Sequence, residues 1–237
     1  MHSGPTTPLP DDLIGVWRRV SLSIVGGAAS EDSRVVWIQG RTLFADVRSP
    51  LEGASADVAP MSFAGHTSWE EPRIRFHRTI DLNEPVEDAG TLSWRGADLV
   101  ESGQLEWGGR AIAFEEVWRR TPPEGDTLLA LEAQSEDRSG ETHALSGVLV
   151  RLGSHAIAIT DRRRSGGDYC AAYLIHRGGR WLPQWSVGDV AQLPRPPAAS
   201  ETLREGDAVE LPMDVPSFVT RWRVRECGVA PDHSASR

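Results

Sequence analysis

Hydrophobic and polar residues alternate with a period of two through most of the chain, and helical periodicity is absent from the pattern. Alternation of this kind is typical of strands that bury one face. In the first half we expect strands at 16–24, 35–39, 42–48, 62–69, 73–81, 90–94, 97–102 and 110–119. In the second half we expect them at 127–134, 145–152, 155–163, 169–177, 180–187 and 217–225. Short strands separated by Gly, Pro, Asp or Asn predict an all-β protein, either a sandwich or a barrel.

The break between the halves is expected at Thr121-Pro122-Pro123-Glu124-Gly125, because two adjacent prolines cannot continue a central strand. The resulting domains are 12–121 and 126–226.

The two halves also share short sequence features in the same order. Asp46-Val47-Arg48 follows a predicted hairpin in the first half, and Asp161-Arg162-Arg163 follows one in the second. The last predicted strands carry Trp118-Arg119 and Trp222-Arg223. Together these echoes indicate a duplicated unit.

Gly15-Val16-Trp17 on the first strand, with Arg119 or Arg120 on the last strand of that half, resembles the lipocalin pattern. That resemblance implies a tryptophan at the closed end of a barrel, packed against an arginine; guanidinium stacking on indole makes the pairing favourable. We therefore expect Trp17 to be buried against one of these arginines.

A wider resemblance rests on four short segments: Gly15–Arg19, Val36–Gln39, Ala45–Pro50 and Ser62–Thr67. Through them the chain resembles, over residues 12–226, a group of tandem lipocalin-like two-barrel proteins known from fungi and bacteria, most without an assigned biochemical role. It implies two tandem lipocalin-like antiparallel β-barrels and an internal ligand.

Composition narrows the class of partner. With 39% hydrophobic and 25% charged residues the chain is expected to fold, and a net charge of -9 argues against nucleic acid as a partner. No apolar run is long enough to cross a membrane, so no membrane association is expected.

The first residues show neither the basic nor the apolar region of a secretory signal, so we expect a cytoplasmic protein with reduced Cys170 and Cys227. All 25 basic residues are arginine, which excludes Schiff-base chemistry on lysine.

Nine tryptophans are many for this length. Most are expected to fill the core, but Trp37, Trp69 and Trp94 are candidates for the wall of an aromatic-lined cavity.

Asp46 and Arg48 leave the same face of a strand, together with Phe44. They form either a charge pair on the outside of the barrel or a polar pair inside it that orients a ligand. His66 has small neighbours and could act as an acid–base group; the alternative is an exposed or hydrogen-bonded histidine at a strand end.

No metal site and no cofactor are expected, because the histidines and cysteines lack ligand spacing and no nucleotide-binding motif is present. The leading hypothesis is a lipocalin-like barrel that binds a small apolar or aromatic molecule through Trp37, Asp46, Arg48, His66, Trp69 and Trp94. The alternatives are a cofactor-free isomerase, hydratase or lyase with His66 as acid–base, and a protein-interaction scaffold.

Overall fold

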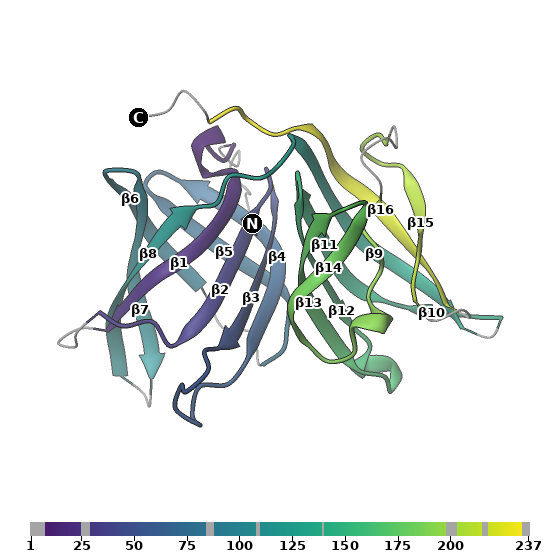
Figure 1. Ribbon diagram of the computed structural model, residues 1–237, viewed down its shortest axis with the longest axis horizontal. Coiled ribbons are helices and arrows are strands. Elements are labelled where there is room, and N and C mark those ends of the chain that lie inside the picture. Colours follow the sequence, from purple (N-terminus) through teal and green to yellow (C-terminus); the bar gives the residue numbers. More distant parts are fainter. Residues whose placement is uncertain are drawn as a thin grey trace, which may run out of the picture.

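The structure is a computed structural model that describes residues 8–24, 29–83, 88–107, 110–138, 140–197, 203–214 and 218–233. Nearly all of its regular structure is antiparallel strand, which confirms the all-β prediction. Three short 3-10 helices accompany the strands: η1 (Asp11–Leu13), η2 (Arg163–Ser165) and η3 (Val190–Gln192). The chain forms two sheet assemblies that lie side by side, purple to teal at the left of Figure 1 and green to yellow at the right.

The first assembly is a closed eight-stranded barrel. Each strand pairs with the next, and β8 pairs back with β1. The strands are β1 (Gly15–Ile24), β2 (Ser33–Gln39), β3 (Leu43–Pro50), β4 (Met61–Glu70), β5 (Arg73–Asp81), β6 (Asp88–Arg95), β7 (Asp98–Trp107) and β8 (Arg110–Arg120). All eight correspond to predicted strands. A barrel of this size has an interior that side chains can fill or that can hold one small ligand.

The second assembly is a large antiparallel sheet rather than a second closed barrel. Its order is β14-β13-β12-β11-β9-β16-β15, with β10 paired to β9. The strands are β9 (Thr127–Arg138), β10 (Glu141–Ala144), β11 (Ser146–Leu152), β12 (His155–Asp161), β13 (Tyr169–Arg177), β14 (Arg180–Val187), β15 (Ala208–Pro212) and β16 (Phe218–Val229). The alternation predicts six of them and misses β10 and β15; residue 217 of the predicted strand 217–225 lies outside the described residues.

The end strands β14 and β15 do not pair with each other in the described part of the sheet. Part of the connection from β14 to β15 packs on this half. Leu193, just after η3, is buried in its core, and Pro194 bridges to Met213 beyond β15. These contacts involve isolated residues rather than a regular pair of strands.

β8 ends at Arg120 and β9 begins at Thr127, so the predicted linker falls between the two assemblies. The division into two domains, and their origin by duplication, stay predictions.

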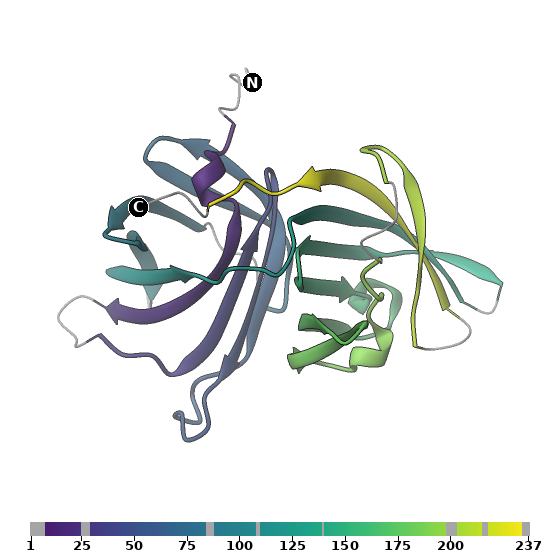
Figure 2. The same cartoon turned by 45° about the horizontal axis from the view of Figure 1, so that its top comes forward.

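The two assemblies share the largest of three hydrophobic cores. On β3, Phe44 points into the barrel, whereas Leu43 and Val47 point out of it toward the second sheet. Val150 of β11 and Ile157 of β12 belong to the same core from the other side. Figure 2 shows β3 and β4 facing the sheet formed by β11, β12 and β13. Strands buried on both faces thus join the halves through one apolar interface.

A single buried carboxylate ties the second half to the β2–β3 turn. Glu226 of β16, which is 2% exposed, accepts hydrogen bonds from the backbone N–H of Arg41 at 2.6 Å, of Thr42 at 2.7 Å and of Leu43 at 2.7 Å. The Thr42 hydroxyl donates a further bond at 2.6 Å. We call this arrangement the Glu226 clamp. Because it joins residues far apart in sequence, it fixes the position of the second half against the barrel.

Candidate functional site

The barrel encloses a cavity of about 400 Å³. Its lining includes Ile24 at the end of β1 and Asp57 and Ala59 in the β3–β4 connection, all of which are exposed. These residues place the mouth at the lower end of the barrel in Figure 1. The volume falls in the range of about 300–1,000 Å³ that is usual for small-molecule sites.

Aromatic rings form one wall of the cavity. Trp37 makes edge contacts with Phe76 and Trp118, at ring-centroid distances of 5.4 Å and 5.5 Å. Phe44 lies 4.9 Å from Phe76. Interlocked rings of this kind present a rigid apolar surface to the enclosed space.

The opposite end of the barrel is closed. Trp17 is fully buried, and the Arg120 guanidinium lies 4.2 Å from the centre of its ring. Arg120 also donates a hydrogen bond to the Ile14 carbonyl at 2.7 Å, whereas Arg119 points to the surface. The predicted contact between Trp17 and an arginine is therefore confirmed, with Arg120 as the partner.

A charged network forms the second wall. Arg48 donates to Asp46 at 2.9 Å and lies 3.6 Å from Glu116. Arg19 donates to Glu116 at 2.6 Å and to Glu31 at 2.8 Å. Burial raises the pKa of Asp46, although the neighbouring Arg48 guanidinium acts in the opposite direction. These two arginines are thus satisfied by protein carboxylates.

Arg78 completes the network beside Phe63. Its guanidinium pairs with Asp81 at 3.0 Å and with Asp88, and it lies 3.6 Å from the centre of the Phe63 ring. Arg48 approaches the same ring at 5.1 Å. One aromatic ring of the cavity wall is therefore already stacked with cations.

Glu101 differs from the other acidic residues of the lining. It is 3% exposed, and the hydrogen bond found for it in the described structure is the one donated by the Trp118 indole at 3.2 Å. Burial raises the pKa of Glu101 well above its ordinary range, and repulsion from Glu116 and Asp88 adds to the rise, whereas the charge of Arg48 acts in the opposite direction. Its carboxyl group thus borders the cavity without a cation bonded to it.

Three of the predicted site residues line this cavity: Trp37, Asp46 and Arg48. The interpretation of Asp46 and Arg48 as an outer charge pair is wrong, because both side chains share the inner face of β3 with Phe44.

Trp69 and Trp94 lie inside the barrel but away from the cavity. Trp69 packs in the barrel core at the end of β4, and Trp94 lies 6.0 Å from Trp17 at the closed end. Neither belongs to the cavity lining.

His66 lies outside the barrel. Its Nε2 is 2.9 Å from Glu132 of β9, across the boundary between the halves. The reason is the alternation of β4: Phe63 and Trp69 face inward, and His66 lies an odd number of residues from both, on the opposite face. The prediction that His66 takes part in a ligand site inside the barrel therefore does not agree with its position.

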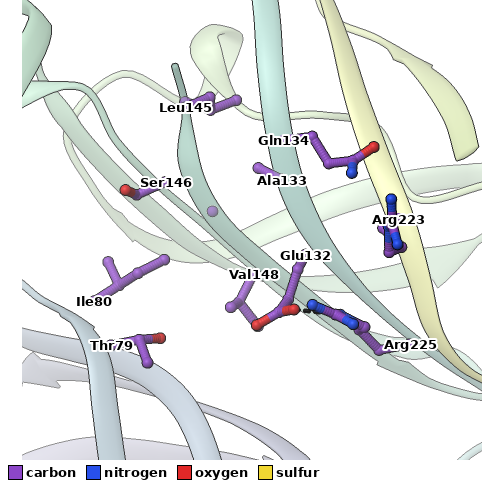
Figure 3. Close-up of a pocket in the computed structure, with 11 residues that line it drawn as sticks. Thr79, Ile80, Glu132, Ala133, Gln134, Leu145, Ser146, Val148, Arg223 and Arg225 are labelled. Atoms are coloured by element: carbon purple, nitrogen blue, oxygen red, sulfur yellow. Dashed lines mark hydrogen bonds and ion pairs between the residues drawn. The ribbon is translucent and has the colours of Figure 1, made fainter.

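A second hollow, of about 480 Å³, lies between the two halves (Figure 3). Thr79 and Ile80 of the barrel border one side, and Glu132, Arg223 and Arg225 border the other. Arg225 pairs with Glu132, and the hydrogen bond with His66 lowers the pKa of that carboxyl. None of the described residues that line this groove is aromatic. The barrel cavity is consequently the better candidate for an apolar ligand.

Arg19, Glu101 and Glu116 also line the cavity but are not predicted as site residues from the sequence. Glu116 could have been found, because it lies two residues from Trp118 on one strand and must share its inward face. Glu101 carries a weaker signal. It lies two residues from the inward-facing Leu99 on β7, but the adjacent Val100 is apolar as well, so the sequence does not reveal which face of this strand points inward.

Within the described residues no group of three or more His, Cys, Asp or Glu side chains is arranged to hold a metal ion. Cys170 and Cys227 are free thiols. None of the helices described is long and apolar enough to span a bilayer.

Comparison with known proteins finds a family model and solved structures that cover most of the chain. A family model described as Protein HRI1 matches residues 15–226. The crystal structure of the uncharacterised protein YLR301w from Saccharomyces cerevisiae is 15% identical, with 90% of this chain and 98% of that chain covered and a TM-score of 0.67. A protein of unknown function from the DUF3598 family of Nostoc punctiforme is 12% identical over 91% of this chain and 96% of its own, but its TM-score of 0.26 carries no weight. No curated protein matches the chain. The yeast likeness shows a shared fold.

Proposed function

This chain belongs to the HRI1 protein family, and we propose that it binds a small molecule with an apolar or aromatic body inside its N-terminal barrel, in the manner of a lipocalin. The observation that carries the proposal is an enclosed space of about 400 Å³ beside the ring cluster of Trp37, Phe76 and Trp118. Cavities with mainly apolar walls and a few placed polar groups are the usual form of small-molecule sites.

The polar groups of the cavity wall would orient a bound ligand as well as contribute to its affinity. Asp46, Arg48 and Glu116 form one network at the side of the cavity, whereas Phe44 and Phe63 supply apolar surface. A ligand with one apolar and one polar end would therefore have a preferred direction of entry.

The remaining predictions of function have less support. His66 is bonded to Glu132 outside the cavity, so an acid–base reaction at this histidine has no enclosed substrate site. The free thiols of Cys170 and Cys227 support our expectation that the protein works in the cytoplasm.

A neutral fluorescent probe tests the proposal. N-phenyl-1-naphthylamine becomes bright in apolar surroundings, so titration into the full-length protein should give a saturable rise in probe fluorescence. Leu22→Trp places an indole in the cavity wall and should weaken probe binding by about tenfold or more. The matched control Leu182→Trp, on exposed β14, should bind as the unmodified protein does.

Far-ultraviolet circular dichroism on both variants establishes that the fold is kept. Saturable binding that Leu22→Trp leaves unchanged would place the probe elsewhere and contradict the proposal. No saturable binding by the unmodified protein would favour the scaffold interpretation instead.

A further inference from the structure

The charges around the barrel cavity do not balance. Three arginines line it: Arg19, Arg48 and Arg78. Six acidic residues line it: Asp32, Asp46, Asp57, Asp88, Glu101 and Glu116. Acidic groups therefore outnumber basic ones in the lining, and Glu31 and Asp81 behind it pair with the same arginines.

Each of the three arginines is paired with protein carboxylates through at least one nitrogen, although the buried Nε of Arg78 has no hydrogen-bond partner in the described structure. Arg19 bonds to Glu31 and Glu116, Arg48 bonds to Asp46, and Arg78 pairs with two aspartates. An anionic ligand at the paired nitrogens of these arginines would compete with their carboxylate partners, and anywhere in the cavity it would meet the surplus acidic groups. Breaking a buried ion pair is strongly unfavourable, so anions are disfavoured.

Glu101 is left over from this pairing. It is almost wholly buried, borders the cavity, and accepts a neutral hydrogen bond from Trp118 through Oε2. In the described structure no hydrogen bond reaches its Oε1. A buried carboxyl group whose hydrogen bond comes from a neutral donor is less well compensated than one that is bonded to a cation.

The surroundings of Glu101 suit an organic cation. Trp118 and Phe114 border the same cavity and offer ring surface, and the stacking of Arg78 on Phe63 shows that this wall accommodates positive charge over an aromatic face. An ammonium group beside Glu101 would supply a directly bonded cation, whereas the nearby Arg48 guanidinium is bonded to Asp46 and acts on Glu101 only through its charge.

We propose that the barrel cavity selects an aromatic or apolar amine, with its ammonium group paired to Glu101 and its apolar body against the ring cluster around Trp37. This inference rests on the proposed function, because it names the class of ligand for the same cavity.

Three probes that share a naphthalene ring system distinguish the proposed preference for an amine from the proposed binding function. 2-Naphthylmethylamine is a cation at neutral pH, 2-naphthylmethanol is neutral, and 2-naphthoate is an anion. Their affinities are measured with the full-length protein by displacement of bound N-phenyl-1-naphthylamine. The amine should bind about tenfold or more tightly than the alcohol, and the anion should bind more weakly than both.

The variant Glu101→Gln should remove the advantage of the amine while it leaves the affinity for the alcohol within about twofold. Glu115→Gln is the matched control, because Glu115 is the neighbour of Glu116 on β8 and pairs with Arg95 at the surface. It should keep the full preference for the amine. Amine binding should also release protons, measured by calorimetry in buffers of different ionisation enthalpy, since pairing with the ammonium favours the charged form of Glu101.

The outcomes are distinct. If the alcohol binds but the amine binds no better, or if Glu101→Gln keeps the preference, the inference on ligand class is overturned and the binding function stands. If none of the three probes displaces N-phenyl-1-naphthylamine from a saturable cavity site, the inference on ligand class is likewise overturned and the binding function stands. If N-phenyl-1-naphthylamine itself shows no saturable binding at the cavity, the proposed function fails.

Discussion

Replacing Glu226 with alanine leaves three backbone N–H groups of the β2–β3 turn without their acceptor. The acceptor is charged, and a hydrogen bond to a charged group contributes about 1.5–3 kcal/mol. Arg41 and Thr42 are exposed, so water can replace the carboxylate there, whereas Leu43 is buried. We therefore expect a loss of about 3–5 kcal/mol in the free energy of unfolding, less than the sum of four such bonds.

The assay is equilibrium unfolding of the full-length protein in urea, followed by tryptophan fluorescence and circular dichroism. A loss of this size corresponds to a drop of roughly 6–20 °C in melting temperature for a chain of this length. Glu226→Gln keeps one oxygen as an acceptor, so its free energy of unfolding should lie between those of Glu226→Ala and the unmodified protein. The control is Glu210→Ala on β15, whose surface contact with Arg221 is long, at 3.3 Å, and should cost less than about 1 kcal/mol.

Equal destabilisation by Glu226→Ala and Glu210→Ala would refute the reasoning, because the Glu226 clamp would then contribute no more than a surface pair. Separate transitions for the two halves in the unmodified protein would equally contradict a shared core that joins them.

Three further predictions concern buried side chains. Trp17→Ala should lower the free energy of unfolding by about 3–5 kcal/mol in urea, as for other large core aromatics, and an unchanged melting temperature would show that the closed end is not packed as described. Burial lowers the pKa of His155 to about 4, so the folded protein binds fewer protons than the unfolded chain as pH falls from about 6.5 toward 4. Unfolding titrations should show that this residue costs about 2–3 kcal/mol of stability between about pH 7 and about pH 4.5, a loss that His155→Gln should not show. The pKa of Glu101 is raised, first by burial, and this has the opposite effect on stability. The free energy of unfolding falls as the pH rises from the ordinary pKa of a glutamate through the raised pKa of Glu101. Glu101→Gln should therefore stabilise the protein more at about pH 8 than at about pH 5, and an equal effect at both values would contradict an unpaired carboxyl.

The strands of the barrel could be predicted from the sequence because hydrophobic and polar residues alternate along most of them. β3 is different: Leu43 and Val47 are apolar on its outward face, and Phe44 is apolar on its inward face. A strand with both faces buried is a sign of two layers packed together. Residues 141–144 and 208–212 give no such signal, because β10 is almost wholly exposed and β15 is a short edge strand that ends in Pro212.

The site could be predicted only in part. Trp37 and Asp46 follow from alternation once the inward face of their strands is known. His66 follows the same rule, because its odd spacing from the inward-facing Trp69 places it on the outward face of β4, whereas its small neighbours carry no information about that face. The inward position of the Glu101 side chain depends on Gly90, which packs against it. Any Cβ at residue 90 would lie 2.4 Å from the Glu101 carboxyl group, and a single sequence does not reveal such a contact.

The central claim is that a small molecule occupies the barrel cavity, and the indole N–H signals of the nine tryptophans report on it most directly. In two-dimensional NMR spectra of the ¹⁵N-labelled full-length protein, saturating N-phenyl-1-naphthylamine should shift the signals of Trp37 and Trp118, which border the cavity. Trp181 and Trp222, in the second half, should stay in place. Shifts confined to Trp181 and Trp222, or no shift at a probe concentration that saturates fluorescence, would contradict the claim.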